Sequence, residues 1–176
     1  MTPETALAEL LRSRGAADID HPGGTLDDHL ARVQQRLAGL GAPETVQLAG
    51  RAHAVYGTDG FAVPLLALDE RPLLAALVGD EVEQLVYRYC ACDRRKSWGA
   101  LADTGRIRDR FTGGGDVLDG LELRDFADLS LVNELDVAEH SASFCDEHGA
   151  YFRRLTMAWE PLLSAPVLAD ARAVFG

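Results

Sequence analysis

The chain has 176 residues, a length typical of one domain, and 47% of them are hydrophobic, which is enough for an ordinary core without disulfides or a structural metal. The 17 Lys and Arg residues are outnumbered by 28 Asp and Glu residues, and the formal net charge is −11 at pH 7. Because such a surface repels phosphates, we expect no nucleic-acid partner. No apolar run reaches the roughly 20 residues of a membrane span, and the first residues lack a signal-peptide pattern. We therefore expect one cytoplasmic domain over residues 1–176, with no membrane partner.

Helical periodicity dominates the first half of the chain. The spacing of apolar residues predicts helices over 4–14, 25–40, 43–53 and 70–78, and an irregular, glycine-containing loop over 16–24. Thr25 stands in the N-cap position of the second helix, with Asp28 in the capping-box position three residues later. Asp80 stands in the N-cap position of a further helix, and Asp93 shares that helix's apolar face at its far end.

Residues 94–120 are the least helical part of the sequence. Arg94, Arg95 and Lys96 are most simply a solvated helix end. Residues 106–111 alternate as a strand does, a glycine-rich turn follows at 112–116, and 117–123 has the character of a return strand. We therefore expect one short β-hairpin near 106–123. Glycines beside arginines are also compatible with an anion site, although the βαβ context of a phosphate loop is missing.

The last third of the chain predicts helices over 124–147, 148–160 and 164–175. Three polar residues, Asn133, Asp136 and His140, interrupt the apolar face of the first of these helices. They are candidate ligands of a metal or substrate. The alternative is that Asp136 and His140 form an exposed pair one helical turn apart.

Two histidines, His29 and His53, lie on the apolar faces of predicted helices. A buried imidazole has two ring nitrogens that need partners, so two imidazoles facing one interior indicate a metal, a bound ligand or a polar network. The alternative is that each is a core histidine whose nitrogens are satisfied by the protein itself.

Three motifs surround these histidines: His-Pro-Gly-Gly-Thr-Leu-Asp-Asp-His-Leu at 21–30, Ala-Gly-Arg-Ala-His-Ala-Val-Tyr-Gly-Thr at 49–58 and Tyr-Cys-Ala-Cys-Asp-Arg at 89–94. On these motifs and the order of its elements, the chain resembles the HD-domain superfamily of helical metal-dependent phosphohydrolases and its oxygenase relatives over residues 20–140. It is most similar to a family of small HD-related proteins without an established activity. The resemblance implies an all-α, HD-domain-like bundle of about six to eight helices, with His29 and His53 as the first and second histidines of the site.

The sequence departs from the HD pattern at two positions. Ala54 replaces the aspartate that follows the second histidine, and Asn133 stands where the last aspartate is expected. Losing two carboxylates removes the anionic charge that holds a hard divalent cation and activates its water.

Three functional hypotheses follow. In the first, the chain is a hydrolase or oxygenase whose altered centre of His29, His53, Asp136 and His140 binds iron, manganese or zinc. In the second, a metal-free isomerase, lyase or cyclase uses His29 or His53 as general acid or base, oriented by Asp93 or Asp136 and aided by Tyr56 as a hydrogen-bond donor.

In both enzyme hypotheses a small-molecule substrate also contacts His21, Thr58, Arg94 and Asn133. In the third hypothesis the same residues form a degenerate HD pocket that binds a ligand or partner without chemistry. The oligomeric state is left open.

Overall fold

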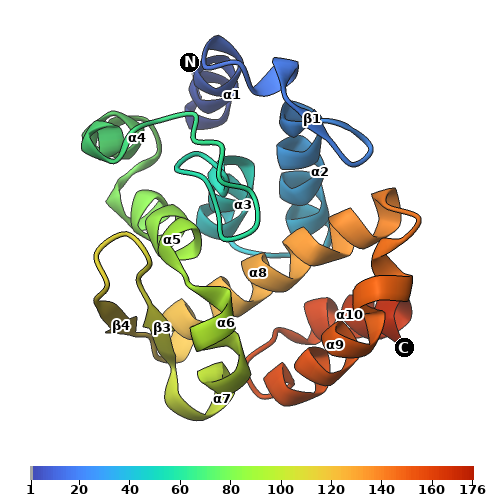
Figure 1. Ribbon diagram of the computed structural model, residues 1–176. Coiled ribbons are helices and arrows are strands. Elements are labelled where there is room, and N and C mark those ends of the chain that lie inside the picture. Colours follow the sequence, from blue (N-terminus) through green and yellow to red (C-terminus); the bar gives the residue numbers. More distant parts are fainter. Residues whose placement is uncertain (1) are drawn as a thin grey trace. The chain divides into compact units, whose positions relative to one another are not determined.

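The computed structural model describes residues 2–176 and divides the chain into two compact units, Met1–Cys90 and Ala91–Gly176. Each unit is built mainly of α-helices (Figure 1). The predicted all-α class with short hairpin structure is therefore confirmed. The single domain and the HD-like arrangement stay predictions. Within the described residues, no helix combines the length and the apolar character that crossing a membrane requires.

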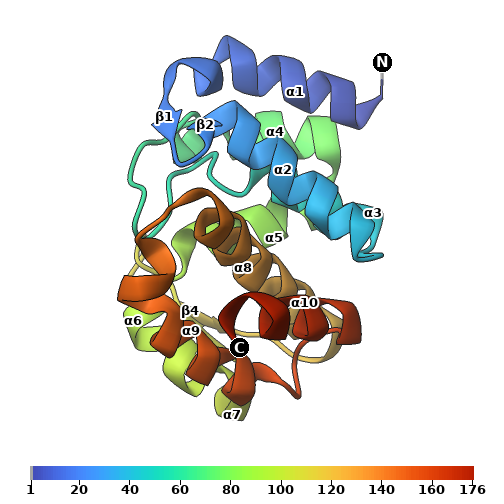
Figure 2. The same ribbon diagram turned by 90° about the vertical axis from the view of Figure 1, so that its right-hand side faces the viewer.

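The described part of the first unit contains α1 to α4 and one small hairpin, and its last helix, α5, runs to the boundary with the second unit. Its elements are α1 (Pro3–Ser13), β1 (Asp20–His21), β2 (Gly24–Thr25), α2 (Leu26–Gly39), α3 (Glu44–Ala52), α4 (Arg71–Val78) and α5 (Asp80–Ala91). Helix α2 packs against α3, and α1 packs against α3 and α4 (Figure 2). The core of this unit is made by the apolar faces of these helices, including Leu7, Leu30, Val33 and Leu37, which are fully buried.

Helix α2 begins where the capping pattern predicts. The Thr25 hydroxyl accepts a hydrogen bond from the Asp28 N–H at 3.2 Å, and the Asp28 carboxylate accepts one from the Thr25 N–H at 2.9 Å. The hydrogen bond from the Thr25 N–H, followed by one from the Thr25 hydroxyl, holds the pKa of Asp28 below its ordinary value. The capping box thus fixes the start of α2, and with it the phase at which His29 enters the core.

Helices α2 and α3 approach closely at Gly50. A Cβ atom at this position would lie 2.5 Å from Cδ1 of Leu37 and 3.4 Å from Cγ1 of Val33. Only glycine, which has no Cβ, lets the Leu37 and Val33 side chains approach the α3 backbone this closely. The close approach packs Gly50, near the C-terminal end of α3, against the second half of α2.

The second unit is built around one long helix. Its elements are α6 (Arg94–Ser97), α7 (Leu101–Thr104), β3 (Arg106–Arg108), β4 (Gly115–Val117), α8 (Gly120–His140), α9 (Phe144–Trp159) and α10 (Ala165–Phe175). Helix α8 packs against α9 and α10, while α6 packs against β3. Every residue of α8 from Phe126 to Asp136 is buried, so this helix forms the core of the unit.

Four boundary predictions are wrong. Residues 16–24 are not wholly irregular, because β1 and β2 form a hairpin that pairs Asp20 with Thr25. Arg94–Lys96 does not end a helix but begins α6, because the Asp93 side chain caps the N–H of Lys96 at 3.2 Å.

The other two corrections concern the second unit. The hairpin near 106–123 is confirmed, but its return strand is Gly115–Val117, with Arg106 opposite Val117. The predicted helix 124–147 is broken: α8 ends at His140, Ser141 is extended, and α9 begins at Phe144 rather than at 148. Serine competes for backbone hydrogen bonds and favours helix ends, which explains the break at Ser141-Ala142-Ser143.

Candidate functional site

The two histidines singled out by the sequence meet inside the first unit. His29 lies in the first turn of α2 and His53 is the C-cap residue of α3. Their Nε2 atoms are 3.2 Å apart, and the residues are only 1% and 2% exposed. The close packing of α2 on α3 thus produces a buried pair of imidazoles in direct contact.

The hydrogen bond of His53 to its own helix determines its tautomer. His53 Nδ1 lies 2.7 Å from the carbonyl oxygen of Gly50. A carbonyl only accepts, so His53 Nδ1 carries a proton, and the neutral ring presents a lone pair at Nε2. The Nε2–H of His29 is then the donor in the contact between the two rings.

A third histidine extends this cluster. The ring of His21, on β1, stacks on the ring of His29 with centroids 4.0 Å apart. Phe61 meets His21 edge to face at 5.7 Å, and Tyr89 meets His53 in the same way at 5.3 Å. His21 is half-buried, so the histidine cluster (His21, His29 and His53) runs from the interior of the unit towards its surface.

Tyr56 belongs to a separate polar network in the same unit. Its hydroxyl donates to Oε1 of Glu83 at 2.9 Å, and Arg71 donates to both oxygens of that carboxylate, at 2.7 and 2.8 Å. Burial, followed by the charge of Glu83, raises the pKa of Tyr56. The hydrogen bonds to Glu83 likewise raise the pKa of Arg71.

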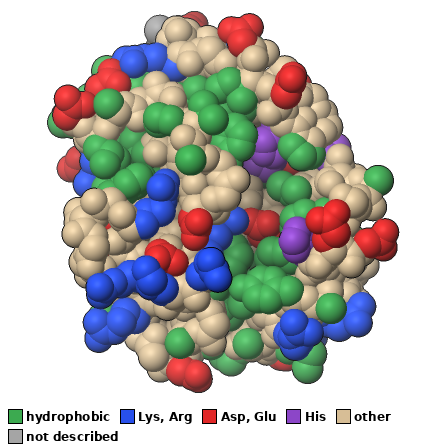
Figure 3. Space-filling model, viewed as in Figure 1, with side chains coloured by type: hydrophobic (Ala, Val, Ile, Leu, Met, Phe, Trp, Pro, Cys, Tyr) green, Lys and Arg blue, Asp and Glu red, His purple; other side chains and the backbone are tan. Residues whose placement is uncertain are grey.

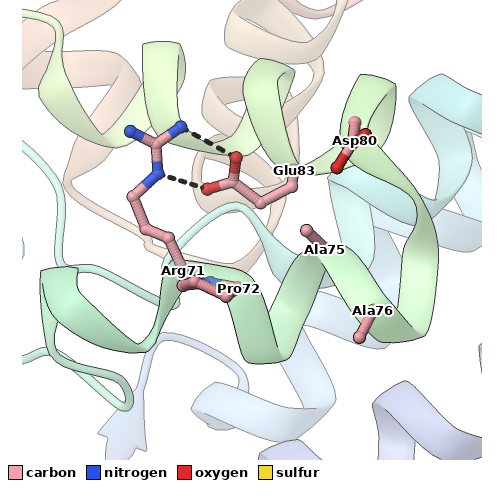
Figure 4. A pocket seen from close by; sticks show the side chains of 6 residues that line it. All are labelled: Arg71, Pro72, Ala75, Ala76, Asp80 and Glu83. Carbon is pink, nitrogen blue, oxygen red and sulfur yellow. Dashed lines mark hydrogen bonds and ion pairs between the residues drawn. The ribbon is translucent and has the colours of Figure 1, made fainter.

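Arg71 and Glu83 line an open cavity of about 500 Å³ together with α4 residues and Asp80 (Figure 4). The close-up shows the guanidinium and the carboxylate engaging each other side by side. Arg71 also stacks over the ring of Tyr87 at 3.7 Å. Glu83 and Tyr87 are one helical turn apart on α5 and hold the same arginine.

Thr58 lies in a tight turn close to the end of α3. It is buried, and its backbone pairs with Phe61 through hydrogen bonds of 2.8 and 3.2 Å. This turn carries Phe61, the residue whose ring contacts His21. The structure therefore gives Thr58 a part in shaping the segment beside the histidine cluster.

The remaining sequence candidates lie in the second unit. Asp93 caps α6 and pairs with the ammonium group of Lys96 at 2.8 Å, and the hydrogen bonds to Lys96 lower its pKa. Arg94 and Asn133 are brought together by a residue that the sequence did not single out, Glu134. Oε1 of Glu134 accepts from Nη1 of Arg94 and from Nδ2 of Asn133, both at 2.8 Å.

Asp136 and His140 lie one turn apart near the end of α8. His140 Nδ1 is 2.8 Å from the backbone carbonyl oxygen of Asp136 and 3.5 Å from its carboxylate. The two residues form a pair one helical turn apart, but Asp136 is only 3% exposed, so the pair is not the exposed one that the alternative describes. Within residues 2–176, no group of three or more His, Cys, Asp or Glu side chains is arranged to hold a metal ion. The four-residue metal set stays a prediction.

Sequence reasoning missed the two buried carboxylates. Glu83 is 5% exposed and Glu134 is 6% exposed, and each is paired with an arginine. Glu83 fits the pattern of a helix-capping residue, which conceals its contact with Tyr56 and Arg71. For Glu134, the available signal was its position beside Asn133 in a helix segment otherwise rich in apolar residues.

Comparison with known proteins points to the same part of the chain. Residues 10–94 match a family model described as a domain of unknown function, DUF6817. No curated protein and no solved structure shows a match. The matched segment contains all three members of the histidine cluster, so the chain is similar to this domain where its most distinctive geometry lies.

Proposed function

We propose that the chain is an enzyme acting on a small molecule, with the His29–His53 pair as its proton-transfer element. The observation that carries this proposal is the 3.2 Å contact between the two Nε2 atoms inside a buried site. Its chemistry is metal-free acid–base catalysis of an isomerisation, elimination or cyclisation. Positioned proton transfer of this kind contributes roughly 10²–10⁴-fold to rate.

The two histidines have different roles in this proposal. Gly50 keeps Nδ1 of His53 protonated, so His53 offers only its Nε2 lone pair to His29. In this proposal His29 takes up the proton from substrate, and the imidazolium that forms is stabilised by its charge-assisted hydrogen bond to His53. His29 is the general base, and His53 orients it, as the third member of a catalytic triad orients its base.

We further propose that this site is derived from an HD-type metal centre. Two consecutive helices bring histidines together, as the resemblance implies for His29 and His53, and this meeting supports an HD-like origin. Ala54 follows His53 in place of an aspartate. In this proposal, replacement of two metal-binding aspartates, at the positions of Ala54 and Asn133, converted a metal centre into a proton-transfer site.

A second candidate is a divalent metal centre that uses the same two Nε2 atoms. With metal–nitrogen distances of about 2.0–2.1 Å, an N–N separation of 3.2 Å corresponds to an angle of roughly 100° at the metal, between the octahedral and tetrahedral values. Two imidazoles suit iron, manganese or zinc better than magnesium. The spacing favours this candidate, but the described residues supply no third His, Cys, Asp or Glu ligand to the group.

The test is an activity screen joined to metal analysis. Wild type, His29→Ala and His53→Ala are incubated with a small-molecule extract, and substrate loss and product gain are followed by mass spectrometry. His148→Ala is the matched control, since His148 is an exposed histidine of the second unit. We expect a conversion by wild type and the control that falls at least 100-fold in both site variants and persists after chelation. Conversion unchanged in a folded His53→Ala protein would refute the pair mechanism.

The same proteins separate the metal centre from the metal-free site. One iron, manganese or zinc per chain, lost in either variant, would replace the first proposal with the second. The binding-module hypothesis is tested by melting temperature. Satisfied core histidines should cost stability when removed, whereas histidines held for chemistry cost little or raise it.

A further inference from the structure

A second cavity lies wholly within the second unit and is lined by none of the three residues of the histidine cluster. It has a volume of about 510 Å³, within the usual range of small-molecule sites. Helices α6, α8 and α9 and the 3₁₀ turn Trp98–Ala100 supply its walls. The lining residues that matter here are Arg94, Arg95, Trp98, Glu134, Phe144 and Tyr151.

Aromatic rings form one side of this cavity. Phe144 stacks on Phe152 with centroids 5.4 Å apart, and Trp98 meets Phe152 edge to face at 6.4 Å. Phe144 is half-buried and Tyr151 is 43% exposed, so both rings remain accessible. In the space-filling view, hydrophobic side chains gather over the region of α6 and α9, with Lys and Arg side chains towards α6 and the β3–β4 hairpin (Figure 3). Such a wall fits a planar apolar group.

The other side of the cavity is charged, and the protein donates to only one oxygen of its carboxylate. Glu134 is 6% exposed, and both of its hydrogen bonds, from Arg94 and Asn133, go to Oε1. Within residues 2–176, Oε2 accepts no hydrogen bond, yet it is not among the fully enclosed polar atoms that lack a partner. Oε2 is therefore accessible, and the cavity is where Glu134 meets solvent.

An accessible carboxylate oxygen that no protein group uses is an acceptor available to a ligand N–H group. The charge of Glu134 extends across the cavity: burial, followed by that charge, raises the pKa of Tyr151. Two cationic side chains lie at the same cavity as the Glu134 carboxylate. Arg94 pairs with Glu134, and the exposed Arg95 lines the opening. The cavity thus combines one acceptor, a guanidinium at the rim and an aromatic wall.

We propose that this cavity binds a free aromatic amino acid. Its ammonium group donates to Oε2 of Glu134, its carboxylate pairs with Arg95, and its ring lies against Phe144 and Tyr151. A ligand with only one of the two charges leaves either the carboxylate or the guanidinium without its partner. A zwitterion with an aromatic side chain satisfies all three features of the cavity.

The test is calorimetric titration of the full chain with four probes: L-phenylalanine, 3-phenylpropionate, 2-phenylethylamine and L-alanine. The second lacks the ammonium group, the third lacks the carboxylate, and the fourth lacks the ring. Because unpaired charged groups are strongly disfavoured, we expect L-phenylalanine to bind at least tenfold more tightly than each of the others. Trp98 lines the cavity, so its fluorescence gives an independent readout.

Two variants assign the charged contacts. Glu134→Gln keeps an acceptor for Arg94 and Asn133, and should weaken L-phenylalanine and 2-phenylethylamine about tenfold while leaving 3-phenylpropionate unchanged. Arg95→Gln, at an exposed position, should weaken L-phenylalanine and 3-phenylpropionate only.

Matched controls come from an exposed ion pair of the same unit. Glu160→Gln and Arg172→Gln should change none of the four affinities, because Glu160 and Arg172 pair with each other on the surface. Absence of L-phenylalanine binding at millimolar concentration, or equal binding of 3-phenylpropionate, would overturn the proposal. Neither outcome depends on His29 or His53, so the histidine site is judged separately.

Discussion

Replacing Gly50 with alanine should disturb the packing that creates the histidine pair. The new Cβ would lie 2.5 Å from Cδ1 of Leu37, a side chain that is fully buried and has little room to move. Val33 closes the other side at 3.4 Å. Helix α3 must therefore shift away from α2, or Leu37 must leave its preferred rotamer. Since the Gly50 carbonyl also accepts the His53 Nδ1–H, either response moves the second histidine relative to the first.

Two opposing terms set the size of the effect. Overpacking a well-filled core costs about 1–3 kcal/mol. Alanine in a helix interior is more favourable than glycine by about 0.5–1 kcal/mol. Taking the midpoints of these terms, about 2 and about 0.75 kcal/mol, we expect Gly50→Ala to lower the free energy of unfolding by about 1 kcal/mol.

Urea denaturation followed by circular dichroism measures this change. Both tryptophans, Trp98 and Trp159, lie in the second unit, so tryptophan fluorescence follows that unit separately. Gly149→Ala is the matched control: it lies within α9, and its new Cβ would meet only Cβ of Cys145, at an ordinary 3.9 Å. This control should gain about 0.5–1 kcal/mol. A Gly50→Ala protein as stable as wild type, beside a control that behaves as expected, would refute the close packing of α2 on α3.

Three further substitutions test individual contacts. Thr25→Ala removes the α2 cap and should cost about 1 kcal/mol in urea denaturation, whereas no loss would show that the cap is dispensable. Tyr56→Phe removes the donor to the buried carboxylate of Glu83 and should cost about 1.5–3 kcal/mol in the same assay, with a loss below 0.5 kcal/mol contradicting that hydrogen bond. Burial raises the pKa of Asp128 above its ordinary 3.8, so the stability it contributes is present below that value and is lost as pH rises through the raised pKa. Asp128→Asn keeps an acceptor for the Ser164 N–H and should therefore be more stable than wild type at pH 7 but not at pH 3; equal stability at both pH values would contradict the raised pKa.

Local signals in the sequence predicted the helices of the first unit well. The Thr25 and Asp28 pair fixes the start of α2 within one residue, because the cap needs only residues three positions apart. The apolar spacing of α2 then places His29 on its buried face. Information of this kind is contained in a single turn of helix, so it does not depend on the rest of the fold.

Boundaries set by weaker or longer-range effects were not predictable. The β1–β2 hairpin pairs only two residues on each strand, which is too short for an alternating pattern to appear. Apolar residues continue at helical spacing through Ser141-Ala142-Ser143, so periodicity joined two helices that the backbone separates.

The histidine cluster was predictable in membership but not in detail. The sequence indicated that His29 and His53 face one interior, and it placed His21 nearby. It did not indicate that the Gly50 carbonyl would set the tautomer of His53, because that bond depends on how the last turn of α3 ends. The proposed roles of base and orienting partner therefore rest on this geometry and not on the pattern of residues.

The two buried glutamates show why hydrogen-bond satisfaction distinguishes a structural network from a binding site. Glu83 and Glu134 are equally buried, each lines a cavity, and each pairs with an arginine. Glu83 uses both oxygens, since Arg71 donates to each and Tyr56 adds a third bond. Nothing at that carboxylate requires a ligand. Glu134 receives its bonds on one oxygen and leaves the other open to a cavity with an aromatic wall, so that oxygen is the acceptor assigned to the ligand in the proposal above.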